Sequence, residues 1–85
     1  MARYSLQVKK SVTKDLRSIP KQDVRRILKK IEALANDPRP AGAEKLSTQE
    51  RYRIRQGRYR ILYEIQDKVL LVVVVKIRKR DEVYR

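Results

Sequence analysis

Residues 51–65 read RYRIRQGRYRILYEI, and charged and apolar side chains alternate on both sides of the pair Gln56-Gly57. Alternation with a period of two is typical of a β-strand that buries one of its faces. A Gln-Gly pair suits a two-residue turn, although less well than Asn-Gly does. The stretch therefore predicts a β-hairpin made of strands 51–55 and 58–65.

The predicted turn determines which side chains share a face of the hairpin. With the turn at positions 56 and 57, Arg55 opposes Arg58 and Arg53 opposes Arg60. Directly opposed residues lie on the same face of a sheet. One face is therefore expected to carry five arginines: Arg51, Arg53, Arg55, Arg58 and Arg60. The other face is expected to carry the apolar set: Tyr52, Ile54, Tyr59, Ile61 and Tyr63.

A face with directly opposed arginines points to an anionic ligand, because like charges placed opposite each other destabilise a sheet. Phosphate fits this face well, since a guanidinium presents a planar fork of donors that matches phosphate oxygens. The alternative is an ordinary solvated face, but such a face normally interleaves both signs of charge. If the last strand continues past Ile77, Lys76, Arg78 and Arg80 share a face that would extend the basic surface.

The segments before the hairpin predict one strand and two helices. Residues 3–8 alternate apolar and polar side chains, which is typical of a half-buried strand. Ser11 or Thr13 is expected to cap a short helix, and Pro20 suits the first position of the next one. A single apolar stripe predicts this longer helix: Val24, Ile27, Leu28, Ile31, Leu34 and Ala35. Its basic side is interpreted as a solvated helix face.

The remaining segments complete the predicted fold. Residues 37–50 contain two prolines and Gly42, and are expected to form a connecting loop. Residues 69–77 are nearly all aliphatic, which is typical of a central strand buried on both faces. The order β-α-α-β-β-β predicts an α+β fold in which a helical hairpin packs on a small antiparallel-meander sheet.

Composition narrows the classes of protein to which the chain can belong. Its 85 residues predict one domain over residues 1–85, and its net charge is +13. Such an excess favours a polyanionic partner, with nucleic acid ahead of an anionic membrane surface or an acidic protein. The absence of cysteine excludes disulfides, thiolate zinc sites and cysteine nucleophiles. Without an apolar run long enough for a membrane span, the protein is expected to be soluble, cytoplasmic and not bound to a membrane.

The chain also lacks histidine, so the commonest metal ligand and the commonest base at neutral pH are both missing. We expect no metal and no cofactor. An enzyme made from this inventory would act by electrostatics, with arginines stabilising charge that develops on an RNA phosphate. RNA brings its own nucleophile, the 2′-hydroxyl. Tyr84 is the candidate proton acceptor near the basic C-terminus, and composition alone favours a packing role for it.

Two stretches resemble the RelE toxins of bacterial and archaeal toxin–antitoxin modules. They are YRIRQGRYRILYEI at positions 52–65 and IRKRDEVYR at positions 77–85, and the resemblance covers nearly the whole chain. It implies a single RelE-like toxin domain that enters the ribosomal A site. There it cuts the mRNA codon by 2′-hydroxyl attack, without a metal. It also implies inhibition by a cognate antitoxin.

The resemblance assigns roles to particular positions. It implies a catalytic set: Arg53, Arg55, Arg60, Arg80 and Tyr84. The surrounding basic residues are expected to bind RNA: Arg51, Arg58, Lys76, Arg78 and Lys79. Many members of the family have Gly-His where this chain has Arg78-Lys79, so a mechanism with an imidazole at that place is excluded here.

Three other interpretations remain open at the level of sequence. A ParE-type protein shares the fold but inhibits DNA gyrase, and typically lacks the full basic set with the terminal tyrosine. A non-catalytic ribosome- or RNA-binding module would need the basic face but not the hydroxyl of Tyr84. An inactive descendant of a toxin would agree with the altered pair at positions 78 and 79.

Overall fold

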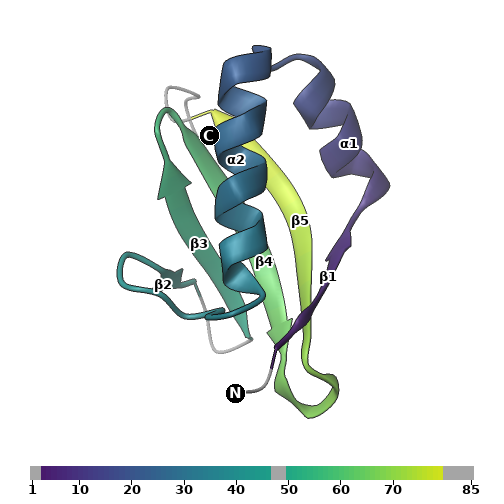
Figure 1. Ribbon diagram of the computed structural model, residues 1–85, viewed down its shortest axis with the longest axis vertical. Helices are drawn as coiled ribbons and strands as arrows, with labels where there is room; N and C mark the ends of the chain where they lie inside the picture. Colours follow the sequence, from purple (N-terminus) through teal and green to yellow (C-terminus); the bar gives the residue numbers. More distant parts are fainter. Residues whose placement is uncertain (1–2, 47–49, 80–85) are drawn as a thin grey trace.

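The computed structural model describes residues 3–46 and 50–79, which form a single five-stranded sheet in the order β1-β5-β4-β3-β2, with two α-helices across one face (Figure 1). The bounds are β1 (Ser5–Val8), α1 (Lys10–Arg17), α2 (Lys21–Leu34), β2 (Glu44–Lys45), β3 (Arg51–Gln56), β4 (Tyr59–Gln66) and β5 (Leu71–Lys79). A short 3₁₀ turn at Asp67–Val69 joins the last two strands. Within the described ranges, both α-helices are too short and too polar to span a membrane.

The predicted α+β class and the order of its main elements are confirmed, with two corrections to the sheet. Strands β3, β4 and β5 form the expected antiparallel meander, but β1 pairs with β5 in parallel. The chain returns to the sheet only after two helices, so β1 and β5 can run in the same direction. The second correction is β2, a two-residue strand inside the segment predicted as a loop.

The helices lie where the apolar periodicity predicts them, but their starts differ. Lys9 occupies the N-cap of α1 and makes no side-chain capping bond, so the predicted cap at Ser11 or Thr13 is wrong. Pro20 is the N-cap of α2 and not its first residue. Within the predicted stripe, Ile27, Ile31 and Leu34 are buried, whereas Leu28 is 44% exposed and faces away from the core.

The hairpin between β3 and β4 turns one residue later than predicted. Gln56 pairs with Tyr59 and Arg55 with Arg60, so Gly57 and Arg58 form the turn. Gly57 has φ +59°, a conformation that glycine adopts without the steric cost of a side chain. The predicted pairs Arg55–Arg58 and Arg53–Arg60 are therefore wrong. Each partner moves by two residues, so the division of the side chains between the two faces is preserved.

The core lies between the helices and one face of the sheet. Tyr63 and Ile61 of β4 are fully buried there, together with Ile27 and Leu34 of α2 and Val12 of α1. The opposite face of the sheet, called the open face below, carries the charged residues of β3 and β4. Strand β5 begins at Leu71, later than predicted, and its segment Val72–Val74 is buried on both faces as predicted.

An irregularity in β5 decides which of its side chains reach the open face. Lys76 pairs with Leu62, whereas Val74 pairs with Tyr63, so Val75 is an extra residue in the strand. Such a bulge reverses the alternation of side chains beyond it. Val72 and Val74 therefore point to the core, and Arg78 points to the open face beside Arg60.

Candidate nucleic-acid interface

Three arginines from three neighbouring strands form a row across the open face. Arg55 of β3 pairs with Arg60 of β4, and Arg60 pairs with Arg78 of β5. Adjacent strands lie about 4.8 Å apart, so neighbouring side chains of the three residues are close enough for their guanidinium groups to bind the same phosphate. We call these residues the arginine row. The bulge in β5 thus brings Arg78 to the face that carries the arginines of the hairpin.

A small hollow of about 30 Å³ lies at one end of the arginine row, and its lining comes from β2, β3 and β4: Glu44, Arg53, Arg55 and Arg60. We call it the basic hollow. The Nη2 atom of Arg53 donates a hydrogen bond to Oε2 of Glu44 across 3.2 Å. The side chain of Glu44 is two-thirds exposed, so its carboxylate is accessible from solvent.

Glu44 is the residue that sequence reasoning missed. Two residues are too few for a periodic pattern, and prolines and a glycine dominate the segment before them. The pairing of Glu44 with Arg53 arises only when β2 adds to the edge of the sheet. Among the carboxylates of the described ranges, Glu44 is the one that lines the basic hollow.

The other predicted RNA-binding residues are distributed around the arginine row. Arg51 lies on the open face but forms an ion pair with Glu64, with 2.7 Å between Nε and Oε2. Lys76 pairs with Leu62 of β4, a position on the open face. The Nζ atom of Lys76 lies 3.4 Å from Oδ1 of Asp15 on α1. Both cations are therefore partly neutralised by neighbouring carboxylates.

Arg58 and Lys79 do not join the arginine row. Arg58 belongs to the turn, and Lys79 pairs with Tyr59 on the helix side of the sheet. Both residues line a larger hollow of about 740 Å³ at the end of the helices, which also contains Asp15 and Asp23. Arg80 and Tyr84 lie outside the described residues.

The side chains on the open face favour phosphate binding. Arginine is always charged in proteins and acts only as a donor, so the row can bind an anion but cannot accept a proton. Glu44 supplies an acceptor at its edge. The described residues contain no group of acidic side chains that could hold a metal ion.

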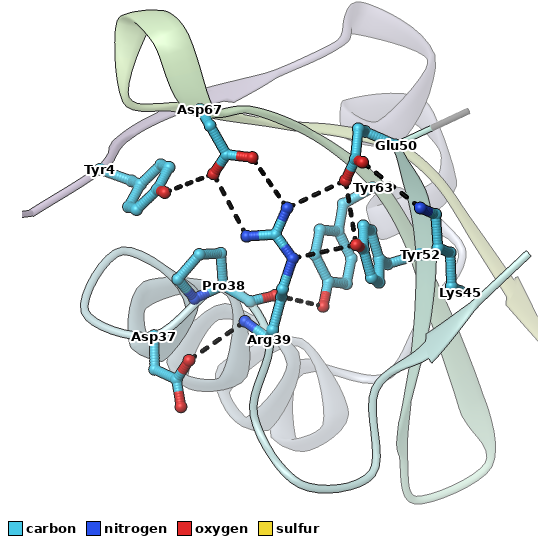
Figure 2. Close-up of polar contacts among 9 residues, drawn as sticks. All are labelled: Tyr4, Asp37, Pro38, Arg39, Lys45, Glu50, Tyr52, Tyr63 and Asp67. Carbon is cyan, nitrogen blue, oxygen red and sulfur yellow. Dashed lines mark hydrogen bonds and ion pairs between the residues drawn. The ribbon is translucent and has the colours of Figure 1, made fainter. Parts of the chain in front are cut away.

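A second polar cluster lies at the opposite end of the sheet from the Gly57 turn (Figure 2). Its centre is Arg39, whose Nη2 lies 2.9 Å from Oε2 of Glu50 and 2.9 Å from Oδ2 of Asp67. Its Nε donates a hydrogen bond to the hydroxyl of Tyr52, and the hydroxyl of Tyr4 donates one to Asp67. We call these five residues the Arg39 cluster.

The Arg39 cluster shifts the pKa values of its carboxyl groups. Hydrogen bonds from Arg39 and Tyr4 lower the pKa of Asp67 to about 2, and those from Arg39 and Tyr52 lower the pKa of Glu50. The cluster joins the segment before β1, the loop after α2, the start of β3 and the turn after β4. The donors and acceptors of these residues form hydrogen bonds with one another. We therefore assign the cluster a structural role.

Beneath the Arg39 cluster, the buried hydroxyl of Tyr63 donates a hydrogen bond of 2.7 Å to the carbonyl oxygen of Pro38. Burial raises the pKa of Tyr63 to about 12. The ring of Tyr63 stacks on that of Tyr52, with 5.8 Å between the centroids. The contact attaches the loop after α2 to the middle of the sheet.

Comparison with known proteins agrees with this architecture. An archaeal RelE–RelB complex from Pyrococcus horikoshii contains a chain that superposes with a TM-score of 0.82 at 28% identity, over 98% of this chain and 100% of that one. The isolated RelE toxin of E. coli superposes with a TM-score of 0.81 at 21% identity, over 94% and 87% of the two chains. The latter likeness concerns the fold alone.

Sequence comparison gives the family. A protein of Methanocaldococcus jannaschii with the name "Putative toxin RelE1" is 25% identical over 87 residues, covering 98% of this chain and 97% of that protein. Residues 6–84 match the family described as the ParE toxin of the type II toxin–antitoxin system parDE. The RelE-like fold predicted from the sequence is thus confirmed. The chain belongs to the ParE toxin family and is a toxin of a type II toxin–antitoxin module of the RelE/ParE type.

Proposed function

We propose that this toxin is a ribosome-dependent endoribonuclease that cuts mRNA in the ribosomal A site. The observation that carries the proposal is the arginine row, which meets a carboxylate-edged hollow on the open face. Opposed arginines are unfavourable in the free protein and become favourable when a phosphate lies between them. The resemblance to RelE toxins supplies the ribosome and mRNA as partners.

In the proposed reaction, the 2′-oxygen of the ribose attacks the adjacent phosphorus and the bond from phosphorus to the 5′-oxygen breaks. The products are a 2′,3′-cyclic phosphate and a 5′-hydroxyl. The row and Arg53 stabilise the negative charge that develops on the phosphate oxygens. Glu44 accepts the proton of the 2′-hydroxyl as general base. Arg80 and Tyr84 stay in the proposed catalytic set. Because Glu44 takes the role of proton acceptor that the sequence suggested for Tyr84, the phenol of Tyr84 instead donates a proton to the leaving 5′-oxygen.

A cognate antitoxin is the proposed inhibitor. The complexes similar to this chain include RelE toxins bound to RelB antitoxins from Pyrococcus horikoshii and from E. coli. With a net charge of +13, this toxin would attract an acidic protein encoded beside it. Such a protein is expected to cover the open face, and the toxin is expected to act in the cytoplasm.

The test is mRNA cleavage on programmed ribosomes with the wild type, Arg60→Ala, Glu44→Gln and Tyr84→Phe, and free RNA as the control substrate. The proposal expects cuts at the A-site codon that require the ribosome. Each substitution should lower the single-turnover rate by about 10²-fold or more. Cutting of free RNA at an equal rate, or full activity of Arg60→Ala, would contradict it.

Inhibition of DNA gyrase is the second candidate, and the match to the ParE family favours it. A supercoiling assay with purified gyrase distinguishes the two. Inhibition by the wild type, together with failure to cut mRNA on ribosomes, would replace the first proposal with this one. Ribosome binding without cutting or gyrase inhibition would leave the non-catalytic module or the inactive descendant.

A further inference from the structure

We propose that Glu50 is a positioning residue, which holds strand β2 so that the carboxylate of Glu44 faces the basic hollow. The inference rests on the proposed function, because Glu44 is the general base of that proposal. It joins the Arg39 cluster to the candidate site, although the two lie on different sides of the sheet.

Strand β2 has little backbone support of its own. It consists of two residues on the edge of the sheet, and its pairs with β3 are Glu44–Arg53 and Lys45–Tyr52. One further backbone hydrogen bond, from the amide of Leu46 to the carbonyl oxygen of Arg51 across 2.9 Å, follows the strand. So short an edge strand is not stable by pairing alone.

Side-chain contacts supply the missing support through Lys45. Its Nζ lies 3.4 Å from Oε1 of Glu50, and the other carboxylate oxygen of Glu50 lies 2.9 Å from Nη2 of Arg39 (Figure 2). Glu50 also accepts a hydrogen bond from the hydroxyl of Tyr52, and the guanidinium carbon of Arg39 lies 5.2 Å from the centre of the Tyr52 ring. Glu50 thus links the ammonium group of Lys45 to a network that includes the buried Tyr52.

The alternation of side chains transmits this support to the other face. Lys45 pairs with the buried Tyr52, so it lies on the helix side, while Glu44 pairs with Arg53 on the open face. When the side chain on one face of a strand is fixed, its neighbour is fixed on the other. A shift of β2 by one residue would exchange Glu44 and Lys45, placing an ammonium where the site needs a carboxylate. Glu50 therefore acts on the basic hollow without touching it.

The test combines cleavage with amide hydrogen exchange in the full chain, using Glu50→Ala in the wild-type and in the Glu44→Gln backgrounds. If Glu50 acts through Glu44, Glu50→Ala lowers the single-turnover rate by about tenfold in the wild type, without weakening ribosome binding. It changes the rate by less than about twofold when Glu44 is already glutamine, because the two effects are coupled.

Amide exchange gives a measure that does not depend on cleavage. Glu50→Ala should speed exchange of the Leu46 amide by about tenfold or more, and leave the amide of Lys9, which bonds to Val74 at the far edge, unchanged. Glu50→Gln keeps an acceptor for Arg39 and Tyr52, so its effects should be smaller. Ile31→Val in the core is the control for general destabilisation, and should leave the cleavage rate unchanged.

Unchanged exchange at Leu46 would overturn the proposal whatever happens to cleavage. The proposal would also be overturned if the Leu46 amide exchanges faster but the losses in cleavage rate from Glu50→Ala and Glu44→Gln multiply in the double variant. Glu50 would then have a structural role that is independent of Glu44. If the wild type does not cut mRNA on ribosomes, the proposed function fails together with the catalytic part of this inference. The exchange result then still decides whether Glu50 holds β2.

Discussion

Arg60 is the residue on which the proposed site most depends, because it is the middle member of the arginine row. It opposes Arg55 on one side and Arg78 on the other, and it also lines the basic hollow. Arg58 is two residues away and carries the same charge, but it lies in the turn and lines a different hollow. The two arginines therefore form a matched pair for mutation.

We expect Arg60→Ala to lower the rate of mRNA cleavage by about 10²-fold or more, and Arg58→Ala to lower it by less than about threefold. Arg60→Lys should recover only part of the loss, because an ammonium keeps the charge but lacks the planar fork. Single-turnover cleavage on programmed ribosomes measures all three. Equal losses for Arg58→Ala and Arg60→Ala would mean that charge alone matters, and not the register of the row.

Tyr63 shows how one buried polar atom attaches a loop. Its ring is fully buried and its hydroxyl donates to the carbonyl oxygen of Pro38 across 2.7 Å. Tyr63→Phe leaves this carbonyl without its donor, so we expect the free energy of unfolding to fall by about 1–2 kcal/mol. Urea denaturation measures the change. An unchanged midpoint would indicate that water replaces the hydroxyl.

The β3–β4 hairpin is the element that sets the site, because its turn decides which arginines face one another. Gly57 has φ +59°, and the space around its Cα would accept a methyl group without a contact closer than 4 Å. The cost of a side chain at this position is therefore one of backbone conformation and not of packing.

Gly57→Ala should lower the free energy of unfolding by about 1 kcal/mol, and Gly57→Asn by less, because asparagine tolerates the left-handed region better. Urea denaturation of the two variants and the wild type gives the order. If alanine were as stable as glycine, the turn would have changed its conformation, and the pairing of Arg55 with Arg60 would then require a new examination by NMR.

At the scale of the whole molecule, the Arg39 cluster joins four segments that are distant in sequence. Asp67 has a pKa of about 2 against an ordinary value of 3.8, because its charged form receives hydrogen bonds from Arg39 and Tyr4. A carboxyl group with a lowered pKa in the folded state stabilises the fold above its ordinary pKa. The contribution is lost as the pH falls toward the lowered value.

We therefore expect the stability of the wild type to fall between about pH 4 and pH 2, and Asp67→Asn to be less stable at pH 7 with a weaker dependence over that interval. Thermal unfolding followed by circular dichroism at several pH values measures both. Glu32→Gln, which alters an exposed carboxyl group on α2, is the control and should keep the slope of the wild type. If the stability of Asp67→Asn depended on pH as strongly as that of the wild type, the Arg39 cluster would not be the source of the pH dependence.

The charge of the whole molecule gives a salt dependence. If about three phosphates are bound, affinity for ribosomes should fall about tenfold or somewhat more between 50 and 200 mM salt. Arg60→Ala should reduce the slope of log affinity against log salt by about 0.7, whereas substitution of a residue away from phosphate should not. Equilibrium binding at four salt concentrations gives the slopes, and a flat dependence for the wild type would exclude phosphate as the main contact.

Patterns in the sequence were enough to predict the class of fold, the helix α2, the hairpin and the division of its residues between two faces. All of these features depend on periodicity. The turn lies one residue later than predicted, but the residues of each face stay the same, because moving a cross-strand partner by two residues does not change the alternation along the strand. The sequence also indicated the basic face, because arginines at every second position need no tertiary contact to share a side.

Which cations lie next to one another depends on tertiary contacts that the sequence patterns do not predict. The bulge at Val75 turns Arg78 toward Arg60, and a bulge has no reliable signature in an unbroken run of valines. Glu44 enters the site because the two-residue strand β2 pairs with the edge of β3, and the Arg39 cluster joins four segments that are distant in sequence. Such contacts form between residues that are distant in the sequence, so neither periodicity nor composition predicts them.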